Sequence, residues 1–175
     1  MIGDDNLDII EGIMTRRSIR HFNGELISDE QLDTMLRAGF QAPSAHNMQP
    51  WEFIVVRDKA KLAKIKEFHK YAKMVEDAGT VIVVCGNRSK QENMGFLVSD
   101  TSAAIQNMLL TAHGLGLGAV WCGIYDEPGY PLRFSEILNL PEQILPIGMV
   151  VVGNKIKDRS MQDRYDEDKI HYDTW

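Results

Sequence analysis

The segment MLRAGFQAPSAHNMQPWEFIVV, residues 35–56, passes from one hydrophobic pattern to another through a short loop. It begins in an apolar-faced helical pattern that ends near Gly39. It closes in a run of aromatic and β-branched residues, which favour strands. Between the two patterns, Pro43 and Pro50 mark the loop QAPSAHNMQP. The segment therefore predicts a helix, a compact loop and a strand from Trp51 to Arg57, in a fold that mixes both kinds of element.

The helices on either side of this segment have recognisable starts. Ser28 and Gln31 have the spacing of a capping box, in which each side chain bonds the backbone of the other residue. Asp58 can cap the lysine-rich helix that follows the strand. A further helix is predicted near the N-terminus, where apolar residues recur at helical spacing after polar residues that can cap it. The apolar residues are Leu7, Ile10, Ile13 and Met14, and the candidate caps are Asp4, Asp5 and Asn6.

The rest of the chain continues to mix strand and helix patterns. Apolar runs predict strands in TVIVVCGN, AVWCGI and LPIGMVVVGN, with a short helical pattern before the first and the last of them. Residues 95–113 form the longest helical pattern and are apolar on more than one face, so we expect a central helix. Without a strict βαβ repeat, this pattern predicts a single α+β domain over residues 1–175, with helices packed on a sheet of about four strands.

The composition of the chain limits the classes of function that it can have. The chain has 175 residues, of which 44% are hydrophobic and 25% charged, and this suits one globular domain. The formal net charge of −6 disfavours nucleic acid as a partner, because such binding depends on phosphate neutralisation. The N-terminal stretch lacks the features of a signal peptide, and no apolar run approaches the roughly 20 residues that cross a bilayer. We therefore expect a cytoplasmic protein without a membrane partner.

Common catalytic and metal-binding motifs are missing from the sequence. The two cysteines are far apart, and none of the five histidines has zinc-ligand spacing with another His or Cys, so no metal site is expected. Gly114, Gly116 and Gly118 have the alternating spacing found in a dinucleotide-binding fingerprint, which needs a strand before the glycines and a helix after them. Here the order is reversed, so these glycines predict the end of a helix and a tight turn.

The segment TRRSIRHF, residues 15–22, carries a local excess of positive charge in an acidic chain. Arg16, Arg17 and Arg20 surround Ser18, and cations so close together repel unless they lie in water or around an anion. Several guanidinium groups, a hydroxyl and backbone N–H groups together bind phosphate well. A solvated helix end is the alternative explanation. An RNA-binding patch is disfavoured by the net charge and by the lack of interleaved aromatic residues.

Four segments together resemble the motifs of the nitroreductase family of flavin enzymes. In chain order they are TRRSIRHF, MLRAGFQAPSAHNMQPWEFIVV, GLGAVWCGI and ILPIGMVVVG, and the resemblance covers most of the chain. It implies a nitroreductase-like α+β fold with a mostly antiparallel sheet, and a homodimer that binds FMN non-covalently at its interface. It also implies that NADH or NADPH donates hydride to flavin N5, from which a nitroaromatic, a quinone or a similar acceptor takes it by a ping-pong mechanism.

Because the cofactor carries the redox step, no catalytic side chain is expected. Two alternatives stay open beside the nitroreductase activity. One is a flavoenzyme of the same fold with another reaction, such as dehalogenation or flavin destruction. The other is a flavin-binding protein with low turnover.

The resemblance also implies roles for particular residues. Arg16, Ser18 and Arg20 would hold the FMN phosphate and the edge of the ring, with Arg17 beside them. Cys122 or Gly123 would present a backbone N–H near flavin N5. A loop from the other subunit would line the isoalloxazine, and its residues are Pro43, Ser44, Ala45, His46 and Asn47.

The resemblance implies further roles, and for two of them several residues of this chain are candidates. A cation after the last strand would close the phosphate site; Arg159 is preferred among Lys155, Lys157, Arg159 and Arg164. A lysine would reach the flavin pyrimidine, and here Lys73 is preferred to Lys70. His46 and Trp121 would shape the substrate pocket, although Trp121 could also be a core residue. A C-terminal arm of about residues 155–175 would reach the partner subunit.

Overall fold

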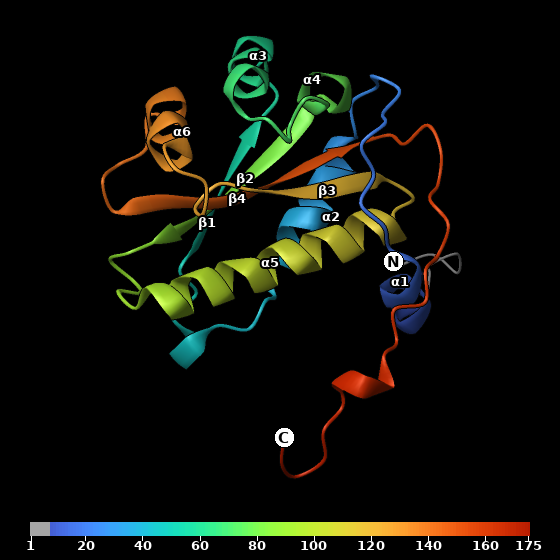
Figure 1. Cartoon of the computed structure of the whole chain (residues 1–175). Helices are drawn as coiled ribbons and strands as arrows, with labels where there is room; N and C mark the ends of the chain where they lie inside the picture. Colours follow the sequence, from blue (N-terminus) through green and yellow to red (C-terminus); the bar gives the residue numbers. More distant parts are fainter. Residues whose placement is uncertain (1–7) are drawn as a thin grey trace.

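The structure, a computed structural model, describes residues 8–175. Its centre is a four-stranded antiparallel sheet with the strand order β1-β2-β4-β3 (Figure 1). The strands are β1 (Trp51–Val56), β2 (Thr80–Asn87), β3 (Gly118–Gly123) and β4 (Ile144–Gly153). The predicted α+β fold with about four, mostly antiparallel strands is therefore confirmed. β1 and β3 are the edges of the sheet, and the backbone groups on an open edge are available to a ligand.

Helices cover both faces of the sheet (Figure 1). One face packs against α2 (Asp29–Phe40) and α5 (Met94–Gly114), and the other against α3 (Lys59–Phe68), α4 (Val75–Ala78) and α6 (Tyr130–Leu138). Side chains alternate between the faces along β4: Val150 packs with the α2–α5 layer, and its neighbours Met149 and Val151 pack with the other layer. Two hydrophobic cores therefore lie on opposite sides of one sheet.

The expected central helix is α5, which has 21 residues. It packs against α2 as well as the sheet, which explains why its sequence is apolar on more than one face. The Asn93 side chain caps its start by accepting a hydrogen bond from the N–H of Phe96 at 3.1 Å. Gly116, with φ of 74°, lies in the turn between the end of α5 and β3. The predicted helix end and tight turn at these glycines are confirmed.

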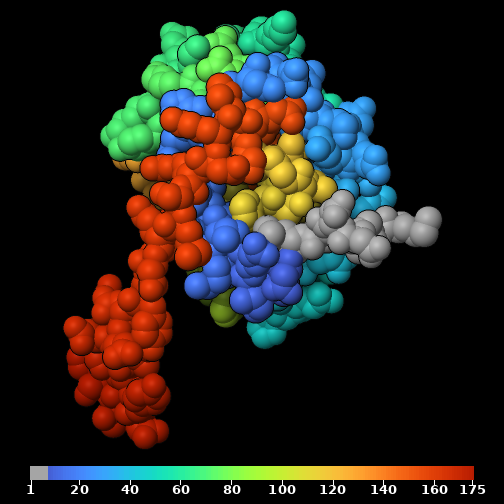
Figure 2. Space-filling model, turned by 90° about the vertical axis from the view of Figure 1, so that its right-hand side faces the viewer, coloured from blue at the N-terminus to red at the C-terminus, as the bar shows by residue number. Residues whose placement is uncertain are grey.

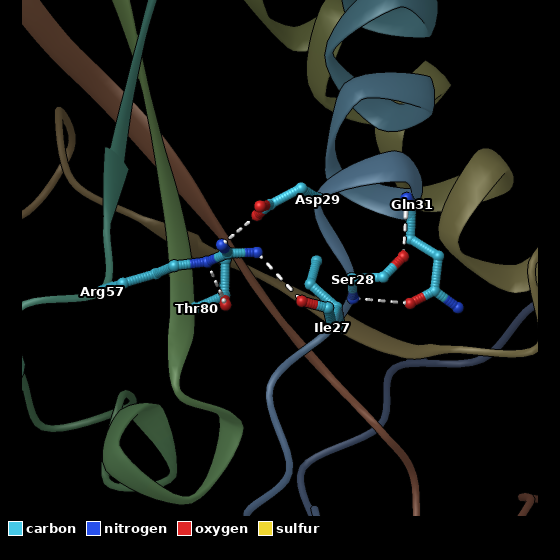
Figure 3. Close-up of polar contacts among 6 residues, drawn as sticks. All are labelled: Ile27, Ser28, Asp29, Gln31, Arg57 and Thr80. Carbon is cyan, nitrogen blue, oxygen red and sulfur yellow. Dashed lines mark hydrogen bonds and ion pairs between the residues drawn. The ribbon is translucent and has the colours of Figure 1, made fainter.

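The capping box of α2 is present, with both bonds between Ser28 and Gln31 formed (Figure 3). Beside it, Arg57 donates to the Asp29 carboxylate at 2.6 Å and to the Ile27 carbonyl at 3.0 Å. These bonds attach the end of β1 to the start of α2. The predicted cap of the lysine-rich helix α3 is also present, because the Asp58 carboxylate accepts from a backbone N–H of its first turn at 2.9 Å.

The first described helix, α1 (Ile9–Thr15), differs from the expected one at its start. Its cap is Asp8, whose carboxylate accepts a hydrogen bond from the Ile10 N–H at 2.8 Å. The caps expected at Asp4, Asp5 and Asn6 are therefore wrong for this helix; these residues and Leu7 lie outside the described part of the chain. The expected apolar face is present in α1, but residues 8–175 do not cover it: Ile10, Ile13 and Met14 are exposed.

After β4 the chain runs over the body and then away from it as a projecting tail (Figures 1 and 2). The tail contains one short helical turn, Glu167–Lys169, and its large side chains Tyr165, Tyr172 and Trp175 are exposed. Within residues 8–175, no helix combines the length and apolar character needed to cross a membrane. The arrangement places three segments near the β3 edge: residues 15–22, residues 69–74 and the chain after β4.

Candidate functional site

The basic segment lies beside the edge strand β3. The Ile19 N–H donates to the Ala119 carbonyl at 2.9 Å, and Ser18 and Ala119 form an isolated parallel bridge. Further along, Phe22 forms an antiparallel bridge with Lys155, directly after β4. Ile19 and Phe22 are buried, whereas Arg20 is exposed. The two apolar side chains therefore anchor a segment whose polar side chains remain available.

A cationic hollow of about 260 Å³ forms where the chain after β4 returns over the basic segment. The Arg159 guanidinium lies 3.5 Å from the Ser18 carbonyl, and Arg17 donates to the Gln162 carbonyl at 3.1 Å. No carboxylate is among the described residues that line this hollow: Arg16, Arg17, Ser18, Arg20, Arg159, Ser160, Gln162 and Arg164. The pKa of Arg16 is lowered by its burial and by the positive charges of Arg17 and Arg164. The hollow is therefore electrostatically suited to an anion.

The guanidinium of Arg17 is mainly occupied with the backbone. Besides Gln162, it donates to the carbonyls of Met14 at 3.0 Å and Arg16 at 2.6 Å. These bonds join the end of α1 to the chain after β4. Arg17 therefore shapes the hollow, while Arg16, Arg20 and Arg159 form no ion pair with the described residues.

A second hollow of about 280 Å³ adjoins the first and is lined by Ser18, Ile19, Arg20, His21, Lys157 and Arg159. Of the four cations considered after the last strand, Arg159 lines both hollows and Lys155 pairs with Asp158. Lys157 and Arg164 line one hollow each. The contact of Arg159 with the Ser18 carbonyl agrees with the choice of Arg159, although its role in binding stays a prediction.

A third hollow of about 440 Å³ lies at the end of β3, and its lining residues are Arg20, Lys70, Tyr71, Lys73, Met74, Trp121, Cys122 and Gly123. Arg20 lines all three hollows, so it connects the cationic hollow with the hollow at the end of β3. A Cβ added at Gly123 would meet no atom within 4 Å. The strand end is thus open at this position, and its backbone can be approached closely by a flat ligand.

The two candidate lysines both line the third hollow. Lys73 Nζ donates to the Lys66 carbonyl at 2.7 Å, near the end of α3. Lys70 Nζ lies 4.5 Å from the centre of the Tyr71 ring. Both lysines therefore line the hollow, and the choice of Lys73 stays a prediction.

Trp121 and Cys122 contribute to the third hollow in different ways. Trp121 is 38% exposed, and its indole lies so close to Gly148 that a Cβ there would be 2.5 Å from Nε1. Trp121 thus lies on the wall of the hollow and is not simply a core residue. Burial raises the pKa of the Cys122 thiol to about 11, so the thiol is protonated at neutral pH. Its Sγ lies 3.6 Å from the Tyr71 carbonyl.

The structure does not bring the loop of residues 43–47 to these hollows within one chain. The Ala45 N–H donates to the Asp100 carboxylate at 3.0 Å, near the start of α5, whereas His113 at the end of α5 bonds Thr15 at 2.8 Å. Thirteen residues of α5 separate Asp100 from His113, which is about 20 Å of helix. The loop is strained, with φ of 53° at His46 and 55° at Asn47.

Sequence reasoning missed several residues that the structure places at the hollows. Ser160 and Gln162 belong to the returning segment, and Tyr71 and Met74 belong to the turn before β2. His69 was missed as well, although it contacts Gly123. These residue types carry no local pattern that indicates a site, because their positions depend on how distant segments pack.

Comparisons with known proteins show which family this chain resembles. The protein-family model described as "Nitroreductase family" matches residues 13–70 and 66–154. A Methanothermobacter thermautotrophicus protein named "Putative NADH dehydrogenase/NAD(P)H nitroreductase" is 40% identical over 97% of this chain and 88% of its own length. A crystal structure of a protein with the same name from Parabacteroides distasonis has 35% identity and a TM-score of 0.92, covering 95% of this chain and 98% of that one.

A structure that contains a flavin is also similar. It comes from Desulfovibrio desulfuricans and is described as "a putative nitroreductase in complex with fmn". It is 29% identical to this chain, with a TM-score of 0.83, and covers 97% of this chain and 98% of that one. The family match spans far more than half of the sequence, and therefore this chain belongs to the nitroreductase family.

Proposed function

We propose that this protein is an NAD(P)H-dependent oxidoreductase that uses FMN. The observation that carries the proposal is the connection, through Arg20, between a cationic hollow and an open strand end. The names of relatives support it: a Bacillus subtilis protein called "FMN reductase [NAD(P)H]" is 27% identical over 94% of this chain and 73% of its own length. The cytoplasmic location and the single-domain organisation stay predictions.

The residues present fit FMN at both ends of the site. At the cationic end, the Ser18 hydroxyl and the guanidinium groups of Arg16 and Arg159 surround a space that suits a phosphate dianion. An anion there offsets the mutual repulsion that lowers the pKa of Arg16. At the other end, the open space over Gly123 admits a flat ring beside Tyr71 and Trp121.

When bound, FMN supplies the hydride chemistry between NAD(P)H and an acceptor. The residues of this chain bind and orient it. Arg16, Ser18 and Arg159 hold the phosphate, and Arg20 lies between the phosphate and the ring. The Cys122–Gly123 backbone meets the ring edge. Lys73 would place positive charge near the pyrimidine, where it would favour the negative charge of a reduced flavin.

We propose that the site is completed by a second copy of the chain. The loop of residues 43–47 lies about 20 Å of helix away from the cationic hollow in the same chain, and none of its residues lines the three hollows; both observations support a role in a partner's site. The exposed apolar residues of α1 and of the tail supply surface for a homodimer. In that dimer, His46 and Trp121 shape the space that NAD(P)H and the acceptor share in turn.

We propose nitroaromatics or quinones as the acceptor class. The test is steady-state oxidation of NADH and NADPH by the FMN-loaded protein, with and without a quinone or a nitroaromatic. We expect acceptor-dependent oxidation with parallel double-reciprocal plots, the pattern of a ping-pong mechanism. Oxidation that no acceptor accelerates would instead favour a low-turnover flavin-binding protein, and intersecting plots would contradict the ping-pong order.

A further inference from the structure

His69 is a fully buried residue that directly follows α3 and contacts the open end of β3. Its Nε2 lies 2.9 Å from the Gly123 carbonyl. A carbonyl only accepts hydrogen bonds, so Nε2 carries the proton and donates it. Nδ1 is buried with no hydrogen-bond partner among the described residues, so a proton there would find no acceptor, and Nδ1 is therefore unprotonated. The contact therefore requires one particular tautomer of a neutral imidazole.

The surroundings of His69 favour this neutral tautomer. The ring centre lies 4.6 Å from that of Tyr130 and 6.2 Å from that of Phe134, both on α6. Burial in this aromatic setting lowers the pKa of His69, and the charge of Lys73 lowers it further, whereas the Gly123 carbonyl and Glu127 act in the opposite direction. The imidazole is thus a neutral donor fixed between two helices and a strand.

Two further contacts hold the residues that follow His69. The Lys70 N–H donates to the Tyr130 hydroxyl at 3.2 Å, and the Cys122 Sγ lies 3.6 Å from the Tyr71 carbonyl. Residues 69–71 are therefore fixed to the end of β3 and to α6 at three points. Lys70, Tyr71, Cys122 and Gly123 all line the hollow at the strand end.

We propose that His69 is a positioning residue for the flavin ring. Its Nε2–H bond holds the Gly123 backbone and sets the spacing between β3 and residues 70–74, and so it fixes the shape of the hollow before the cofactor enters. The proposal rests on the proposed function, since the ring is that of FMN. A preformed hollow binds its ligand more tightly because less ordering remains to be done on binding.

The first measurement needs no substitution. Nitrogen-15 NMR of the histidine ring in the wild-type protein at pH 7.5, with and without FMN, reports which nitrogen carries the proton. We expect a neutral ring with the proton on Nε2 in both samples. A proton on Nδ1, or an imidazolium, would overturn the proposal, and this result does not depend on flavin chemistry.

The second measurement compares His69→Gln with His69→Met, two side chains of similar length. The Gln amide can donate to the Gly123 carbonyl, whereas Met leaves that carbonyl without its donor. We expect the Met variant to bind FMN about tenfold more weakly than wild type, and the Gln variant to stay within about threefold. With saturating FMN, the Met variant should show a shifted flavin absorption band and a lower kcat, both restored in the Gln variant.

The outcomes distinguish a failure of the role proposed for His69 from a failure of the proposed function. If both variants bind FMN equally weakly, His69 only fills space. If both bind FMN as tightly as wild type, the bond from His69 to Gly123 does not shape the site. Either result would overturn the role of His69. A wild-type protein that takes up no FMN would instead overturn the proposed function. If the Met variant does not fold, the ring-nitrogen NMR and the Gln variant still decide, because loss of FMN affinity with Gln contradicts a donor role.

Discussion

The Ile19 N–H donates to the Ala119 carbonyl at 2.9 Å, and this bond places the basic segment along the edge of β3. Ser18 and Arg20 lie on either side of Ile19, and the open strand end at Gly123 is four residues beyond Ala119. Four residues of strand span about 13 Å. One strand edge therefore carries a cationic hollow near its start and an open hollow at its end.

The flavin itself provides the first prediction. The segment that includes Arg159, Ser160 and Gln162 returns over the cationic hollow. The hollow therefore suits a terminal phosphate better than a nucleotide that continues beyond it. We expect the purified protein to be yellow and to release FMN, not FAD, on heat denaturation, as identified by chromatography. Colourless protein that takes up no FMN from an excess would contradict the assignment.

Arg16 provides the second prediction. Replacing Arg16 with Ala removes a charge-assisted contact to phosphate, which is commonly worth about 1.5–3 kcal/mol, or roughly one to two decades of affinity. Riboflavin lacks the phosphate, so its affinity should change little. Fluorescence titration of the apoprotein with each flavin measures the affinities for FMN and for riboflavin. Arg37→Ala is the control, because Arg37 forms an exposed pair with Asp33. If both flavins weaken equally, Arg16 has a structural role.

Gly123 provides the third prediction. A Cβ at Gly123 meets no atom within 4 Å, so Gly123→Val should fold normally while its side chain fills space that the ring needs. We expect FMN affinity to fall at least tenfold with an unchanged circular dichroism spectrum. Gly114→Ala is the matched control, because a Cβ there is equally unhindered but lies at the end of α5. Wild-type affinity in the Val variant would place the ring elsewhere.

The pH dependence of stability provides the fourth prediction. Burial lowers the pKa of His69 below its ordinary value of 6.5. As pH falls through about 6.5, the unfolded chain takes up a proton that the folded chain does not, so the free energy of unfolding decreases. The contribution of His69 to the free energy of unfolding is therefore fully present above pH 6.5. It is lost as the pH falls from 6.5 towards the folded-state pKa.

Urea unfolding at pH 7.5 and pH 5.5 measures this effect. We expect His69→Gln to lose less stability than wild type between the two values. His113, whose pKa burial also lowers, contributes in the same direction in both proteins. The same loss of stability in the variant and in wild type would show that His69 is not buried as a neutral ring.

The tail provides the fifth prediction. Tyr165, Tyr172 and Trp175 are exposed in the single chain, and burying such side chains is worth roughly 1.5–3 kcal/mol each. Deleting residues 165–175 keeps Arg164 and should weaken both the dimer and FMN binding. Sedimentation and flavin content at micromolar concentration measure the two effects. A truncated protein that stays dimeric and keeps its flavin would show that the tail does not cross the dimer.

The sequence alone determined the features that depend on neighbouring residues. Ser28, Gln31 and Asp58 define helix starts because a cap bonds backbone groups within one turn. The apolar surface of α5 predicts a central helix because each of its faces needs a partner. The excess of arginine around Ser18 predicts an anion site because the repulsion acts over a few residues, and this site stays a prediction. These signals are local, and so they can be recognised without the fold.

Only the tertiary structure decided which distant segments meet. Strand order makes β3 an edge, and Ile19 can pair with Ala119 for that reason. The return of the chain after β4 brings Arg159 to Ser18. Packing of α3 and α6 on one face of the sheet brings His69 to Gly123. These contacts join residues far apart in the sequence, and their stability comes from the burial of the whole core, which no single segment encodes.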